Sequence, residues 1–74
     1  MQLSYGKKGN IYKITEIKLD SEVVRRLYTL GMTKGTLVNV LNQKHSGPMI
    51  IKVRGTRFAL GRRFCEGIFV EEEQ

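Results

Sequence analysis

The sequence predicts a mainly β fold: a small barrel of about five short strands with two short helical segments. Eight glycines in 74 residues separate short apolar runs, so turn signals recur roughly every 8–12 residues, as in small barrels and sandwiches. Only residues 21–30 have the apolar spacing of a helix with a complete start and stop. The chain is long enough for one small domain, which we place over residues 1–74.

The first predicted strand covers residues 10–17 (NIYKITEI), which are rich in β-branched and apolar side chains. Tyr12 and Ile14 share one face of this strand, but the alternation fails after them. We therefore expect a β-bulge near Thr15, because one extra residue restores the inward phase.

A short amphipathic helix follows this strand. Asp20 and Ser21 are suitable N-cap residues. Val23, Leu27 and Leu30 then recur at positions i, i+4 and i+7, which is the apolar stripe of a helix that packs on one side. The helix is expected to begin at Asp20-Ser21.

The helix is expected to end abruptly at Gly31, which occupies the position where a left-handed residue follows a C-cap. In such a Schellman motif, Met32 folds back onto Leu27. Arg25 and Arg26 lie off the apolar stripe, three and four residues after Glu22, a spacing at which either arginine can pair with Glu22.

The second half of the chain predicts four further strands and one helical turn. The strands cover residues 37–41, 49–54, 57–60 and 68–70, and the helical turn covers residues 62–67. Gly55-Thr56 is expected to form a two-residue hairpin loop with glycine at its first central position. This order of elements predicts an SH3-like barrel.

Side-chain alternation and helical spacing predict the core. Its expected members are Ile14, Val23, Leu27, Val38, Val40, Ile51, Val53, Leu60, Cys65, Ile68 and Val70. The last residues, 71–74, are three glutamates and a glutamine, which we expect to be a disordered acidic tail.

The charge is unevenly distributed. Residues 1–70 carry 13 Lys and Arg against four acidic residues, a net charge of +9, which the three terminal glutamates reduce to +6. Such a body favours acidic partners. A single cysteine in so small a chain is typical of a reducing compartment, and no signal peptide is recognisable, so we expect a cytoplasmic protein.

The residues for catalysis or metal binding are not grouped. The single histidine, His45, falls in a polar loop and is expected to be solvated; Cys65 falls among apolar residues and is expected to be a core residue. One histidine and one cysteine in separate segments do not supply the ligands of a metal site. We expect no catalytic residue, no metal site and no cofactor.

Several short motifs together resemble a known family. Residues 25–40 follow the pattern RRLxxLGMxxGxxVxV, and Gly47-Pro48, Ala59-Leu60 and an I-x-V triplet at residues 68–70 come after it. This order and spacing resemble the FeoA family of small cytosolic accessory proteins of bacterial ferrous iron transport. The resemblance extends from the strand around Ile11 to Val70.

The resemblance implies an SH3-like barrel without catalytic activity. It also implies a partner, a ferrous iron membrane transporter whose cytoplasmic end carries a GTPase domain. The protein is then expected to bind this portion of the transporter, to regulate or support iron uptake, and to lie peripherally at the inner membrane surface through this partner. We expect a monomer or a weak dimer.

The expected partner-binding surface is the end of the helix, where apolar side chains flank the bare backbone of a glycine and cations surround them. Its residues are Arg25, Arg26, Leu30, Gly31, Met32 and Lys34. A purely structural alternative stays open, in which Leu30 and Met32 pack beneath the helix and Gly31 only terminates it.

Three other functions stay open at this point. A basic SH3-like module is compatible with nucleic-acid binding. No aromatic stacking pair accompanies the basic residues, however, so we do not expect a nucleic-acid partner. The same domain type occurs at the C-terminus of iron-dependent repressors. Binding to anionic lipid through Lys7, Lys8 and the arginines is a third possibility.

Overall fold

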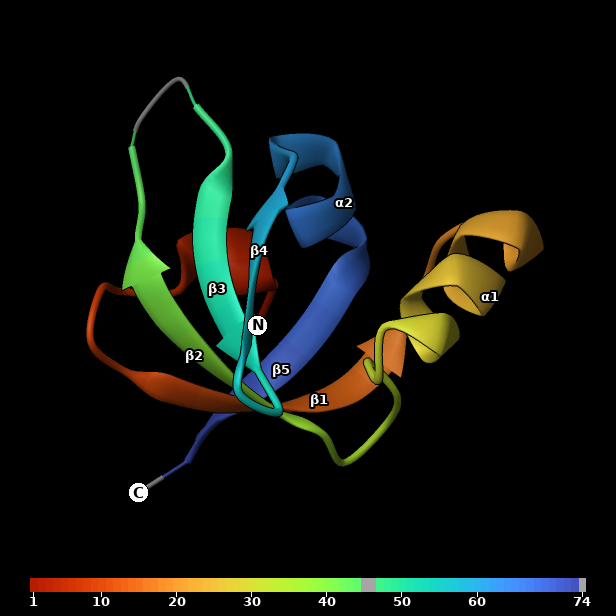
Figure 1. Ribbon diagram of the computed structural model, residues 1–74, viewed down its shortest axis with the longest axis horizontal. Helices are drawn as coiled ribbons and strands as arrows, with labels where there is room; N and C mark the ends of the chain where they lie inside the picture. Colours follow the sequence, from red (N-terminus) through yellow and green to blue (C-terminus); the bar gives the residue numbers. More distant parts are fainter. Residues whose placement is uncertain (45–46, 74) are drawn as a thin grey trace.

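The computed structural model describes residues 1–44 and 47–73, and its main element is one antiparallel five-stranded sheet (Figure 1). The strand order is β4-β3-β2-β1-β5. The strands are β1 (Ile11–Ile17), β2 (Leu37–Asn42), β3 (Met49–Val53), β4 (Thr56–Leu60) and β5 (Ile68–Glu73). The helices are the 3₁₀ helix η1 (Leu3–Tyr5), α1 (Ser21–Thr29) and α2 (Arg62–Gly67). The predicted mainly β fold, with a helix after the first strand and a helical turn before the last, is confirmed.

Strand β1 is an interior strand of the sheet and pairs with β2 along one side and with β5 along the other. Its register with β5 shifts between Ile14 and Glu16, which confirms the bulge expected near Thr15. Tyr12 and Ile14 are buried. The bulge lets β1 bend while it keeps these side chains inside.

The core contains every predicted member except Val23, which is only partly buried and packs against the core from outside. Val23 lies in the first turn of α1, which stands to one side of the sheet (Figure 1). Four core residues were not predicted: Leu3, Tyr12, Met32 and Met49. Thr36 is also buried.

The β3–β4 hairpin differs from the expectation by one residue. Val53 pairs with Thr56, so the two-residue loop is Arg54-Gly55 and not Gly55-Thr56. Both loop residues have positive φ, +51° and +83°, which is the type I′ geometry that continues the strand twist. The glycine therefore occupies the second central position, and an arginine occupies the first.

The acidic end of the chain was wrongly expected to be disordered. Glu71, Glu72 and Glu73 belong to β5 and pair with the first residues of β1. The Lys13 Nζ atom lies 3.6 Å from Glu71 Oε1. Pairing with β1 gives this segment hydrogen-bond partners that the local sequence does not indicate; Gln74 lies outside the described residues.

The N-terminal segment extends the sheet beyond β5. The Met1 ammonium donates to the Val70 carbonyl (3.0 Å), and the Val70 N–H donates to the Met1 carbonyl (2.7 Å). This pairing places Leu3 in the core with no exposed surface. The backbone edge of β5 is thus partly covered by the chain's own first residues.

Candidate protein-binding surface

The end of α1 has the geometry that the sequence predicts. The C-cap is Leu30, and Gly31 has a φ of +89°. The Gly31 N–H donates to the Tyr28 carbonyl (2.9 Å) and the Met32 N–H donates to the Leu27 carbonyl (2.8 Å). These two bonds define a Schellman motif, so the predicted helix stop is confirmed.

Met32 does not lie on this surface. Its side chain is 0% exposed and belongs to the core together with Leu27. The left-handed residue before it reverses the chain direction, and this reversal turns Met32 inward, where an unbranched thioether fills the space under the helix. The expected docking role of Met32 is therefore wrong, and the structural alternative holds for this residue.

The other expected surface residues remain accessible to different degrees. Leu30 is 44% exposed, and Arg25, Arg26 and Lys34 are exposed. Gly31 is half-buried. The structure thus leaves one aliphatic side chain on the surface at the helix end, in a chain segment that also carries three cations.

The pairing with Glu22 that the spacing of the arginines allows is not found. Within residues 1–44 and 47–73, the ion pair between Lys13 and Glu71 is the single one, and neither Arg25 nor Arg26 has a carboxylate partner there. Both guanidinium groups therefore remain available to a partner.

Arg54 is part of the same corner, although sequence reasoning did not place it there. Its Nε–H donates to the Gly31 carbonyl at 3.1 Å. A Cβ atom at position 31 would lie 2.8 Å from Arg54 Cδ, so the glycine leaves room for the arginine to cross. A cation at the carboxyl end of a helix also complements the helix dipole. The Arg54-Gly55 dipeptide indicates a turn in the sequence, but only the register of the β3–β4 hairpin directs the Arg54 side chain to the end of α1.

The turn after α1 fixes the corner further. The Thr36 hydroxyl donates to the Gly31 carbonyl at 3.2 Å, and the Thr33 N–H donates to the Thr36 hydroxyl oxygen at 3.1 Å. The Gly31 carbonyl therefore accepts from two side chains, that of Thr36 five residues further along the chain and that of Arg54 in the β3–β4 hairpin. The backbone at Leu30 is therefore held by the helix before it and by the hydrogen bonds to the Gly31 carbonyl after it.

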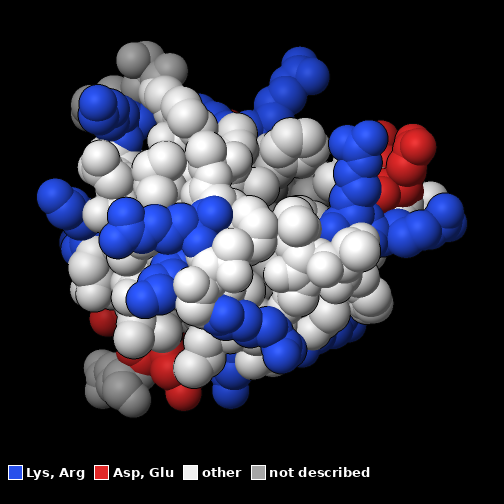
Figure 2. Space-filling view, in the orientation of Figure 1, with Lys and Arg blue, Asp and Glu red and all other residues white. Residues whose placement is uncertain are grey.

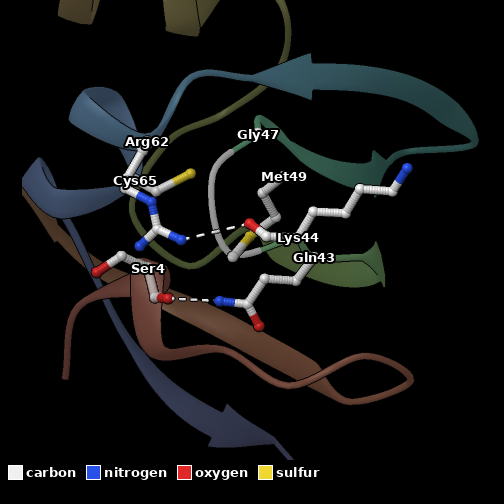
Figure 3. Close-up of a pocket in the computed structure, with 7 residues that line it drawn as sticks. All are labelled: Ser4, Gln43, Lys44, Gly47, Met49, Arg62 and Cys65. Atoms are coloured by element: carbon white, nitrogen blue, oxygen red, sulfur yellow. Dashed lines mark hydrogen bonds between the residues drawn. The ribbon is translucent and has the colours of Figure 1, made fainter.

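Two hollows lie elsewhere on the molecule. A groove of about 510 Å³ runs between the start of α1 and α2, and Phe64, on its wall, is 39% exposed. A second hollow of about 10 Å³ lies beside α2 (Figure 3) and has room for about one water molecule. Figure 3 shows two hydrogen bonds across it, from Gln43 to the Ser4 carbonyl and from Arg62 to the Lys44 carbonyl.

Cys65 lines the smaller hollow but has the character of a core residue. Burial raises the pKa of its thiol to about 11, and the Sγ atom lies 3.7 Å from the Leu60 carbonyl oxygen to which it donates. The thiol therefore stays protonated near neutral pH and is a poor nucleophile. This agrees with the expectation that Cys65 belongs to the core.

Residues 1–44 and 47–73 contain no group of three His, Cys, Asp or Glu side chains that could hold a metal ion. His45, expected to be a solvated loop residue, lies outside the described residues. In the same part of the chain, no helix has the length and apolarity that a membrane span requires.

Comparison with known proteins identifies the family. The FeoA domain family matches residues 1–72. A protein of Methanocaldococcus jannaschii with the provisional name Fe(2+) transport protein A is 28% identical over 72 residues, which cover 97% of this chain and 87% of that protein.

Solved structures agree with this match. The crystal structure of an iron uptake regulatory protein (FeoA) superposes with a TM-score of 0.88 at 29% identity, covering 99% of this chain and 96% of that one. FeoA from Stenotrophomonas maltophilia, described as a prokaryotic SH3 domain protein and complexed with zinc, gives 0.83 at 25% identity, covering 96% and 89%.

A manganese-dependent transcriptional repressor is also similar, with a TM-score of 0.89 at 20% identity, but this chain covers only 36% of it, and the likeness shows the fold alone. The predicted SH3-like architecture is confirmed, and the chain belongs to the FeoA domain family.

Proposed function

We propose that this protein is a non-enzymatic accessory protein of ferrous iron uptake. In this role it acts on the cytoplasmic side by binding the GTPase-containing portion of a ferrous iron membrane transporter. Membership of the FeoA domain family and the iron-transport names of its relatives support the proposal.

The observation that carries the proposal is the exposed Leu30 on a fixed corner. Binding interfaces gain most of their energy from a few apolar or aromatic anchors held in place before binding. The Schellman bonds and the Gly31 carbonyl contacts from Arg54 and Thr36 hold the backbone beside Leu30. A partner that binds here therefore has little backbone left to order.

The cations near this corner indicate the chemistry of the partner surface. Arg25, Arg26 and Lys34 are exposed and lie within ten residues of one another. They favour an apolar pocket with acidic groups at its rim, because complementary charge speeds association and orients the two proteins.

The test is a binding titration of the protein against the purified cytoplasmic portion of the transporter, with and without guanine nucleotide. Leu30→Asn is expected to weaken binding about tenfold or more, as loss of a central anchor does. Ile11→Asn is the matched control, because Ile11 is an aliphatic residue with similar exposure, 41%, near the start of β1. Neither substitution changes the net charge.

The proposal predicts that the Ile11 variant binds like the unmodified protein. Equal loss in both variants would show that Leu30 is not an anchor. No association of the unmodified protein at low salt, in either nucleotide state, would refute the proposal itself.

A further inference from the structure

The outer surface of the sheet carries a charge gradient that the strand registers define. One row of directly opposed residues crosses all five strands, in the order Arg57, Lys52, Asn39, Ile11 and Glu73. The row begins with two cations on β4 and β3 and ends with a carboxylate on β5. The barrel therefore separates a basic end from an acidic end.

The basic end contains an unfavourable pair. Lys52 and Arg57 lie directly opposite each other on neighbouring strands, and both are exposed. Like charges in this arrangement destabilise a sheet. Arg54 adds a third cation at the turn between them. We call Lys52, Arg54 and Arg57 the basic hairpin face.

No carboxylate neutralises this face within the part of the chain that the structure describes, where the one ion pair is between Lys13 and Glu71. Figure 2 shows Lys and Arg side chains over much of the visible face, including the edge beside α1. Lys and Arg side chains cross the region in front of β3 and β4, whereas acidic side chains appear at two edges, beside α1 and near the C-terminus.

We propose that the basic hairpin face binds the anionic phospholipid headgroups of a membrane surface. Lys52 and Arg57 have no hydrogen bond or ion pair to any described residue that would fix their side chains. Exposed cations on a strand pair suit a fluid layer of headgroup phosphates. Dense negative charge across both side chains also relieves their mutual repulsion.

The composition of the hairpin favours lipid over nucleic acid. The next outward positions on β3 and β4 are Ile50 and Ala59, which pair with each other. The aromatic residue next to Arg57 in β4, Phe58, packs against the core and is not an open platform for a base. Ile50 and Ala59 instead offer small apolar side chains to the headgroup region.

The face also sets an orientation. The carboxylates of β5, at the far end of the row, are repelled by an anionic surface while the hairpin is attracted to it. Arg54 is bonded to the Gly31 carbonyl, so the hairpin and the end of α1 move together. Lipid contact through the hairpin thus presents α1 in one direction relative to the membrane.

The test is co-sedimentation with vesicles of phosphatidylcholine alone and of phosphatidylcholine with about a third phosphatidylserine, at low and high salt. Binding is expected only to the anionic vesicles and is expected to fall steeply with salt. The double variant Lys52→Gln/Arg57→Gln is expected to lose affinity roughly 30-fold, since each basic residue at an anionic surface contributes about fivefold.

The matched control is Lys7→Gln/Lys8→Gln, which removes the same charge from an exposed loop between η1 and β1, apart from the β3–β4 turn in Figure 1. Its affinity is expected to stay within about threefold of the unmodified protein. Equal loss in the two double variants would overturn the proposal in favour of attraction by net charge alone. Tighter binding to duplex DNA than to the vesicles would also overturn it.

The proposal does not depend on the transporter. A titration against the transporter portion in detergent, without anionic lipid, tests the end of α1 by itself. Loss of vesicle binding with retained transporter binding, or the reverse, separates the two surfaces.

Discussion

The end of α1 and the outer face of the β3–β4 hairpin are neighbours joined by Arg54, yet they are built in opposite ways. At the helix end, one carbonyl accepts two side-chain hydrogen bonds and Met32 is fully buried beneath it. On the hairpin, Lys52 and Arg57 face each other. A fixed corner with one exposed leucine suits a specific protein contact, whereas exposed cations suit an extended anionic surface.

Met32→Asp removes the packing beneath the end of α1 and has the largest expected effect on stability. A carboxylate with no partner replaces a side chain that is 0% exposed, and such burial costs more than about 3 kcal/mol. A domain of this size has little stability to lose, so urea denaturation followed by circular dichroism should show a largely unfolded protein. A folded variant would mean that Met32 can leave the core.

Gly31→Ala sharpens the comparison by testing how tightly the corner is built. The left-handed φ of +89° alone costs a non-glycine residue about 1–2 kcal/mol of unfolding free energy. The added Cβ would also press on Arg54 Cδ at 2.8 Å. The measurement is the free energy of unfolding from urea titrations.

Gly35→Ala is the control for this variant. Gly35 has nearly the same φ, +87°, but nothing lies within 4 Å of its added Cβ. The difference between the two variants therefore measures the Arg54 contact, and it should shrink when both are made in an Arg54→Ala background. An unchanged difference in that background would show that Arg54 does not press on the corner.

Lys52→Gln is expected to have the smallest effect on the free energy of unfolding and, unlike the substitutions above, to stabilise the protein. Removal of one member of a directly opposed like-charge pair is expected to raise the free energy of unfolding by about 0.2–1 kcal/mol. Thermal unfolding at low salt measures it, and Lys8→Gln, in an exposed loop, should change stability less. A loss of stability in Lys52→Gln would mean that the two cations do not repel each other in the folded protein.

Much of the fold was predictable because its signals are local. The helix stop at Leu30-Gly31-Met32 depends on backbone geometry within six residues, and the two hydrogen bonds that define the motif are present. Strand alternation correctly placed Val38, Val40, Ile51 and Val53 inside. The apolar neighbours of Cys65 in the sequence sufficed to predict that its side chain is buried.

The candidate surface was only half predictable. The sequence placed Leu30 and the cations at the helix end, and the Schellman motif predicted that Met32 contacts Leu27, but the motif left open how much of the Met32 side chain stays exposed. Arg54 entered the surface through a contact across 23 residues. The hairpin register that directs it was predicted one residue too far along the chain, because Arg54-Gly55 and Gly55-Thr56 are both acceptable two-residue loops by composition.

The sequence by itself determined the family, the order of the elements, the helix stop and most of the core, since these depend on short-range periodicity, turn chemistry and motif spacing. Only the tertiary structure decided that Met32 is completely buried, that Glu71–Glu73 form a strand with β1, and that Lys52 opposes Arg57. Each of these depends on pairing or packing between segments distant in sequence, where a shift of one residue reverses the face that a side chain occupies.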